Sequence, residues 1–129
     1  MLSTGESIPT FEPARAHPPQ KERGQVTLGE LIAELKKEPP DKVCRWGFGH
    51  PHSYRGYYDQ LAFEPRENVT VNQMLADAEE SLGKTFTGYK GGDYEMSEWT
   101  DVWIAEYGTA GGEVIGLYAL AFILGRDKP

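Results

Sequence analysis

Two amphipathic helices are indicated by the spacing of apolar residues along the chain. Apolar residues recur at helical intervals over 28–35 and again over 71–82. Each stretch begins at a capping box, in which a Thr and an acid or amide three residues later satisfy each other's backbone N–H groups. The two boxes are Thr27 with Glu30 and Thr70 with Gln73. We predict that the first helix stops after Glu38, before two prolines, and that the second carries Leu82 on its apolar face and is capped by Gly83.

Strands are indicated by runs of aromatic and β-branched residues between and after these helices. Residues 42–48 and 57–63 are predicted to pair, joined by a loop over 49–56 that contains glycines and a proline. Further strands are predicted at 85–87, 100–107 and 113–115, with glycine turns at 91–92 and 108–112.

The apolar run over 117–124 suits either a helix or a short buried strand. Its alanines and leucines favour a helix, which Gly125 would cap. The pattern therefore predicts an α+β fold, with a mostly antiparallel sheet of four or five strands packed with two or three helices.

The first 25 residues differ in composition from the rest of the chain. They hold four of the nine prolines, balanced charges and few apolar side chains, so they cannot form a core of their own. We interpret residues 1–25 as an extended N-terminal arm and residues 26–129 as a single α+β binding domain. The arm is either a tail or a strap that lies on a partner subunit through Ile8 and Phe11.

Charge and cysteine content exclude several classes of function. The formal net charge of −7 belongs to residues 26–129, and no run of Lys or Arg offers a patch for duplex nucleic acid or an anionic membrane. The single Cys44 allows no intrachain disulfide, and no apolar run reaches the length of a membrane span. We therefore expect a soluble protein of the cytoplasm.

The densest group of residues with binding chemistry lies at 45–58. Glycines, aromatic rings, two arginines and two histidines alternate there. Glycine admits a ligand close to the backbone, arginine binds phosphate and aromatic rings stack on bases, so this combination suits a nucleotide site. The alternative is that the aromatic residues are core and the glycines form a turn.

The pair His50 and His52 could share a metal ion, but the sequence offers no spaced third ligand. Loop histidines that make hydrogen bonds are the other interpretation. Known nucleophile, phosphate-loop, dinucleotide and zinc-protease motifs do not occur in the sequence. We therefore predict no catalytic residue, no metal and no cofactor.

A second candidate site covers residues 84–94. Lys90 precedes two glycines and could hold an anion in a turn, while Phe86, Tyr89 and Tyr94 supply flat apolar surface. An ordinary β-turn with a solvated lysine is the alternative.

Several motifs together resemble a family of small phage proteins, the first-described type of anti-Thoeris sponge. The resemblance spans roughly residues 27–112. It rests on Tyr54-Arg55-Gly56, on Leu61-Ala-Phe-Glu-Pro65, on Val71 to Leu75 at the start of a helix, on Thr85-Phe-Thr-Gly-Tyr-Lys-Gly-Gly92 with Tyr94 and Met96, and on Trp103-Ile-Ala-Glu-Tyr-Gly108. It implies a binder that is not an enzyme and that sequesters a cyclic ADP-ribose signal in recessed pockets at a homodimer interface. Further assembly into hexamers, with separate sites for cyclic oligonucleotides, is also implied.

The resemblance assigns roles to some residues. Phe86 takes the position of an aromatic ring against adenine, and Arg126 that of an arginine against the pyrophosphate. Arg126 is the only arginine after residue 66, where the family's pocket uses two. The resemblance makes Arg55, with Tyr54 and Gly56, the candidate for the oligonucleotide site.

These observations predict a homo-oligomeric phage protein of the host-cell cytoplasm that captures a cyclic nucleotide and so blocks Thoeris immunity. One alternative is a phosphodiesterase or lyase that acts on a cyclic nucleotide through His50 and His52. Another is an interaction protein that binds no small ligand.

Overall fold

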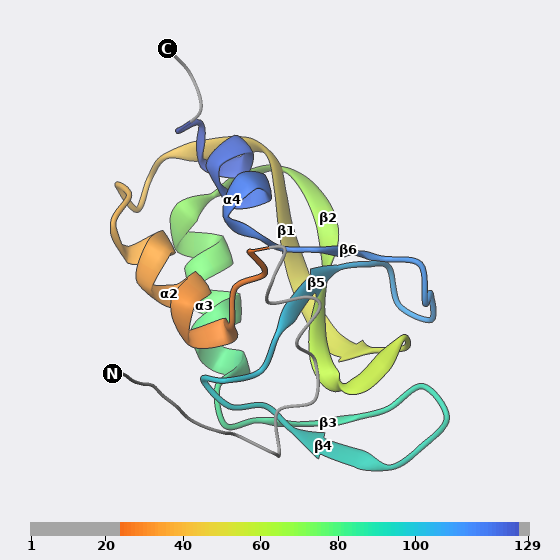
Figure 1. Cartoon of the computed structure of the whole chain (residues 1–129). Coiled ribbons are helices and arrows are strands. Elements are labelled where there is room, and N and C mark those ends of the chain that lie inside the picture. The colour runs from red at the N-terminus through yellow and green to blue at the C-terminus, as the bar shows by residue number, and fades with distance from the viewer. Residues whose placement is uncertain (1–23, 127–129) are drawn as a thin grey trace, which may run out of the picture.

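A four-stranded sheet with helices against one face forms the body of the molecule (Figure 1). The computed structural model describes residues 24–126, and within them the α+β fold class is confirmed. The predicted arm lies outside these residues except for Gly24 and Gln25, which bond to the chain at 116–117. The helices are α2 (Leu28–Lys36), α3 (Val71–Ser81) and α4 (Leu117–Leu124). The strands are β1 (Val43–Tyr54), β2 (Tyr57–Thr70), β3 (Thr85–Thr87), β4 (Asp93–Glu95), β5 (Val102–Ile104) and β6 (Glu113–Val114).

Both predicted capping boxes are present, and they set where α2 and α3 begin. Their ends differ from the prediction by one or two residues. Helix α2 ends at Lys36 rather than at Glu38. Leu82 is the C-cap of α3 in an extended conformation and is 46% exposed, so its predicted place on the apolar face is wrong. The next residue, Gly83, takes the left-handed conformation that the prediction required of it.

The predicted loop over 49–56 is wrong, because the hairpin of β1 and β2 is much longer than the aromatic runs indicated. Strand β1 continues to Tyr54, and only Arg55 and Gly56 form the turn. The register shifts between Gly49 and His52, and His50 has a φ of 51° there. Such a bulge admits Pro51 because β1 lies at the edge of the sheet, where proline removes no ladder hydrogen bond.

The strand order of the main sheet is β1-β2-β5-β6. The neighbours β1 and β2 are antiparallel, as are β5 and β6, whereas β2 and β5 run parallel. The predicted strand over 100–107 is limited to Val102–Ile104. Helix α3 and the small β3–β4 hairpin lie in the connection between β2 and β5. Strand β4 was not predicted, but Gly91 and Gly92 form the predicted turn with φ values of 96° and 85°.

The apolar run over 117–124 is the helix that we favoured, and Gly125 caps it with a φ of 72°. Leu120 and Leu124 are buried, whereas Leu117, Tyr118 and Phe122 are exposed. Within residues 24–126, no helix is both long and apolar enough to cross a membrane.

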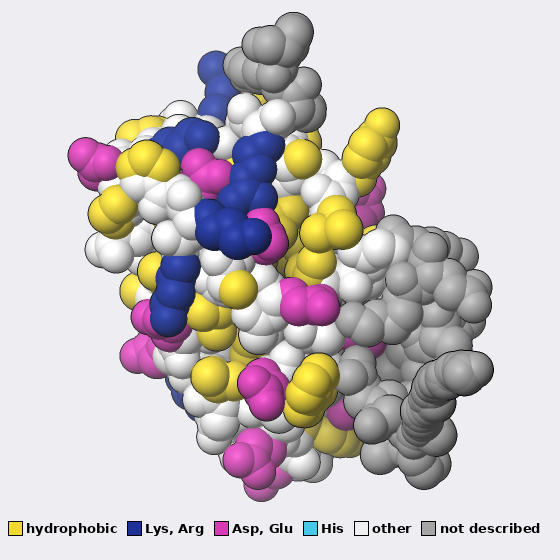
Figure 2. All heavy atoms as spheres, turned by 60° about the vertical axis from the view of Figure 1, so that its left-hand side comes forward, with side chains coloured by type: hydrophobic (Ala, Val, Ile, Leu, Met, Phe, Trp, Pro, Cys, Tyr) yellow, Lys and Arg dark blue, Asp and Glu magenta, His cyan; other side chains and the backbone are white. Residues whose placement is uncertain are grey.

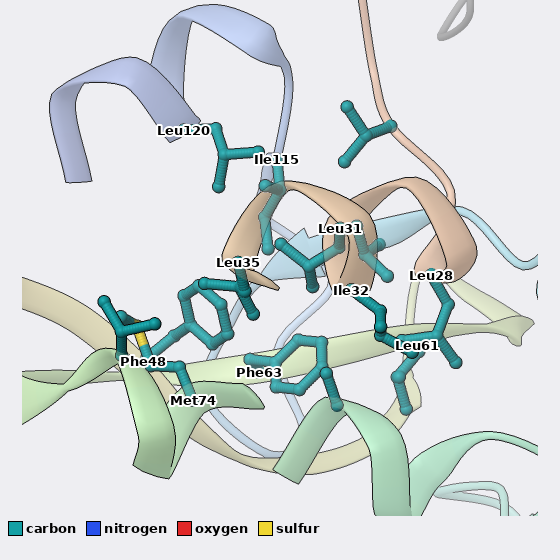
Figure 3. Packing of buried hydrophobic residues seen from close by; sticks show 14 of the residues in the cluster. Leu28, Leu31, Ile32, Leu35, Phe48, Leu61, Phe63, Met74, Ile115 and Leu120 are labelled. Atoms are coloured by element: carbon teal, nitrogen blue, oxygen red, sulfur yellow. The ribbon is translucent and has the colours of Figure 1, made fainter. Parts of the chain in front are cut away.

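One apolar core joins the helices to the sheet. Figure 3 shows the leucines of α2 pointing toward Phe48 of β1 and Phe63 of β2, whose ring centroids lie 4.8 Å apart. The same core takes in Met74 from α3 and Leu120 from α4. A smaller cluster, formed by Tyr54, Ala62, Trp103 and Ala105, adjoins the turn between β1 and β2. This second cluster lies directly beside the candidate site.

Candidate functional site

Arg55 lies in the turn between β1 and β2, and the contacts of its two neighbours hold this turn in place. The neighbouring Tyr54 is buried, its ring stacks on Trp103 with centroids 4.4 Å apart, and its hydroxyl donates to Ala110 O and accepts from Gly112 N. A Cβ on Gly56 would lie 2.6 Å from the Tyr54 ring, so only glycine fits beside that ring. Of the three residues predicted for the oligonucleotide site, Tyr54 and Gly56 thus shape the turn, and Arg55 carries the charge.

Arg55 connects three of the motifs that carry the family resemblance. Its Nη1 donates to Gly108 O at 2.9 Å, and its guanidinium carbon lies 4.4 Å from the centroid of the Tyr89 ring. Gly108 has a φ of 86°, and a Cβ there would lie 3.1 Å from that ring. The Tyr-Arg-Gly turn, the β3–β4 hairpin and the segment after β5 therefore meet at one point.

Tyr107 extends this group, which we name the Arg55 platform: Arg55, Tyr89, Tyr107 and Gly108. The Tyr107 ring lies 5.6 Å from that of Tyr89, and the two side chains are 58% and 44% exposed. An arginine held against an aromatic ring keeps several N–H donors for an anion, and exposed tyrosines offer stacking surface. The platform can therefore bind a phosphate beside a base or a ribose.

A hollow of 450 Å³ lies next to the platform along the chain. Its lining includes Glu106, Thr109 and Glu113. Two carboxylates make this hollow unfavourable for a phosphate, whereas Arg55 is favourable. A phosphorylated ligand would therefore place its charge at the platform.

His52 closes the inner side of the platform. Its ring meets Tyr107 edge to face at 5.5 Å, and its Nδ1 donates to His50 O at 3.2 Å. Its Nε2 is buried with no hydrogen-bond partner among the described residues. Burial lowers the pKa of His52, although the bond to His50 and the carboxylate of Glu64 act in the opposite direction.

We expect the free energy of unfolding to fall as the pH drops from about 6.5 through the lowered pKa of His52 in the folded state. In this range the imidazole of the unfolded chain is protonated more fully than that of the folded chain, so protonation stabilises the unfolded state. His52→Phe keeps a ring against Tyr107 and removes this titration. Denaturant unfolding at about pH 7.5 and pH 5 should show a smaller loss of stability for His52→Phe than for the parent. His50→Phe is the control, and equal pH dependence in all three proteins would contradict the prediction.

His50 lies on the outer surface, where both of its ring nitrogens face charged side chains. Arg66 donates to its Nε2 at 2.9 Å, and its Nδ1 lies 3.6 Å from a carboxylate oxygen of Glu64. Because an arginine can only donate, the Nε2 of His50 is the unprotonated nitrogen. Neither imidazole therefore presents a free Nε2 to solvent. Within residues 24–126, no three His, Cys, Asp or Glu side chains gather as a metal ion would require.

The five residues predicted to bind the cyclic nucleotide, namely Arg126 and the four residues singled out in the segment 84–94, do not form one group. Phe86 and Tyr94 pair across β3 and β4, are only partly exposed, and pack against the core. Lys90 is exposed in the turn between the two strands. Tyr89 belongs instead to the Arg55 platform, so it contacts a residue that we had assigned to the other ligand.

Arg126 lies far from these residues. Figure 1 places α4 at one end of the molecule and the β3–β4 hairpin at the other. Arg126 donates to carboxylate oxygens of Glu34 and Glu38 and, at 3.1 Å, to Glu34 O. These hydrogen bonds lower the pKa of both glutamates. A phosphate at Arg126 would therefore have to displace two carboxylates. Figure 2 shows basic and acidic side chains intermixed on the face of the molecule that it presents.

Tyr107 and Gly108 were missed as site residues, although both lie in a motif that carried the resemblance. A tyrosine at the end of a predicted strand, followed by the glycine that begins a predicted turn, was the available signal. Cys44 takes no part in the platform: it is a buried free thiol, and burial raises its pKa.

Comparison of the chain with protein-family models, with curated protein sequences and with solved structures found no match.

Proposed function

We propose that this protein binds and sequesters a cyclic nucleotide signal of the cyclic ADP-ribose type without degrading it, and so acts as a phage anti-defence protein against host Thoeris immunity. One observation carries the proposal: three motifs, far apart in the sequence, converge on Arg55. Each of them is a motif on which the resemblance to the sponge family rests.

The chemistry of the platform supports an anionic, ring-containing ligand. Arg55 uses one N–H on Gly108 O, which fixes the guanidinium before a ligand arrives. A net charge of −7 repels an anion over the surface as a whole, so binding must come from donors already in position. Arg55 supplies donors for the phosphates, and Tyr89 and Tyr107 supply surface for an adenine or a ribose. The same features suit a cyclic oligonucleotide.

Recovery of the ligand separates a sponge from an enzyme. The protein is incubated with isomers of cyclic ADP-ribose, and in parallel with cyclic oligonucleotides, then freed of unbound ligand and denatured by heat. We expect chromatography to show the intact cyclic nucleotide in the released fraction. A hydrolysed product would instead indicate an enzyme. A thermal-shift screen in which none of these nucleotides raises the melting temperature would contradict binding altogether, because a ligand of the folded state stabilises that state.

Self-assembly is part of the proposal. A ligand that touches both Phe86 and Arg126 needs two copies of the chain, since the two residues lie at opposite ends of one copy. The outer face of α4 offers apolar surface for such a contact: Leu117, Tyr118 and Phe122 are 61%, 95% and 57% exposed. Three apolar side chains grouped on one short helix are typical of an interface between subunits.

We therefore expect the full chain to sediment as a dimer or a larger assembly at micromolar concentration. A Phe122→Glu variant should sediment as a smaller species, because it places a charge on the apolar face of α4. Glu106→Gln, at an exposed position of the loop after β5, serves as a control that should keep the parent's assembly. Sedimentation of the parent as a 14.4 kDa species would contradict the prediction.

A further inference from the structure

A second hollow, on the helix side of the sheet, has a composition that suits a small planar ligand. It measures 280 Å³ and lies between the β1–β2 hairpin and α3. Phe48, Val69 and Ala76 form its apolar lining, and the polar side chains around them include Arg66 and Asp77. None of these residues belongs to the Arg55 platform, so the inference does not rest on the proposed function.

Gly49 brings the two charged side chains of the hollow close together. A Cβ on this residue would lie 3.0 Å from Arg66 Cδ and 3.1 Å from a carboxylate oxygen of Asp77. The guanidinium stem and the carboxylate therefore lie on either side of one backbone position. A larger residue at position 49 would push them away from it.

Arg66 and Asp77 form no ion pair with each other. Arg66 uses Nη1 on His50, and no cation of the described residues forms an ion pair with Asp77. The bond to His50 holds the guanidinium in place, while its other N–H groups remain as donors. The hollow thus offers a set of donors and, opposite them, a half-buried carboxylate that can only accept.

A ligand for this site must carry acceptors on one edge, donors on another and an apolar face between them. Guanine meets this requirement more fully than the other bases. Its O6 and N7 accept two hydrogen bonds from one arginine, and its N1–H and N2 amino group donate to the two oxygens of one carboxylate. We propose that this hollow binds the base of a guanine nucleotide, with Arg66 on O6 and N7 and Asp77 on N1 and N2.

The proposal predicts an order of affinity among three nucleotides that each carry a single phosphate and differ only in the base. Titration calorimetry of the full chain should show that GMP binds about tenfold or more tightly than IMP, which lacks the N2 amino group. AMP lacks the same group, offers no O6 acceptor and should bind more weakly still. Equal binding of all three would mean contact with the phosphate and ribose alone, and the absence of GMP binding in the millimolar range would also overturn the proposal.

Variants at the hollow test the roles of the two charged residues. Asp77→Asn turns an acceptor into a donor at nearly constant volume and should weaken GMP binding about tenfold or more. Arg66→Lys should have a similar effect, because an ammonium cannot make two parallel bonds. Ala76→Phe should block binding by filling the hollow. Glu80→Gln removes an equal charge from α3 outside the hollow and should bind GMP like the parent.

Melting curves show whether these variants remain folded, and Asp77→Asn and Arg66→Lys are the decisive pair because both positions are only partly covered. Two folded variants that bind GMP like the parent would refute the site. The same proteins titrated with cyclic ADP-ribose keep the two hypotheses apart. If the variants lose GMP binding and retain cyclic ADP-ribose binding, the guanine site is supported independently of the proposed function. If the parent binds GMP but not cyclic ADP-ribose, only the proposed function is contradicted.

Discussion

Phe63→Ala is expected to lower the free energy of unfolding by about 3–5 kcal/mol. Phe63 is fully buried, lies on the inner strand β2, and packs against Phe48 with ring centroids 4.8 Å apart (Figure 3). Its backbone also pairs with Ile104 of β5, so the residue lies where the helices and both halves of the sheet meet. Truncation to alanine removes most of the side chain and leaves a cavity that its neighbours fill only in part.

Denaturant unfolding followed by circular dichroism measures this effect. Phe63→Leu keeps most of the apolar volume and should cost less than about 1.5 kcal/mol. A loss of under about 1 kcal/mol for Phe63→Ala would show that this part of the core is not closely packed.

Phe86→Ala should weaken the binding of cyclic ADP-ribose by about 1–3 kcal/mol if Phe86 stacks on adenine, which is the usual contribution of a base-to-aromatic stack. Because the Phe86 ring also packs against the core, the same change should lower the melting temperature. Stability and affinity therefore need separate variants. Phe86→Leu keeps apolar volume and removes the stack, and Phe86→Tyr keeps both.

Calorimetric titration should show parent-like affinity for Phe86→Tyr and reduced affinity for Phe86→Leu, with both proteins melting close to the parent. Arg55→Ala is the matched test of the Arg55 platform: it removes the platform's donors for phosphate and should weaken the binding of both cyclic ADP-ribose and cyclic oligonucleotides. If Phe86→Leu and Arg55→Ala both melt normally and bind every ligand like the parent, both assignments are wrong.

The helix starts could be predicted because their causes are local. A threonine and its partner three residues later decide where α2 and α3 begin, and no distant contact alters that. The left-handed Gly83 and Gly125 were local signals as well. Leu82 shows the limit of this reasoning: apolar spacing continued onto it, but α3 had already ended.

The length of the β1–β2 hairpin could not be predicted, because it depends on a neighbour. Residues 49–54 contain the bulge at His50 and the edge position of Pro51, which read as a loop until the sheet order is known. The parallel pairing of β2 with β5 likewise depends on contacts between segments some 40 residues apart along the chain.

The candidate site was predictable in its residue types but not in its grouping. The sequence indicated arginine, tyrosine and glycine in separate motifs, and Arg55 is indeed held on Tyr89. Two separate ligand sites were predicted for these residues, whereas the structure places them in contact. The distance of Arg126 from Phe86 depends on where α4 packs, and no local pattern reports that.

The distribution of the core along the chain has a consequence for the speed and timing of folding. Leu28 of α2 shares one core with Ile115, Leu120 and Leu124, and Leu61 of β2 pairs with Val102 of β5. Contacts so distant in sequence require large loops to close before the core gains stability, which slows folding relative to helical bundles of similar size. During synthesis, α2 emerges from the ribosome long before these partners exist. The part of the core that residues 115–124 complete therefore stays open to other chains until residue 124 has left the ribosome, so this interval carries a risk of aggregation.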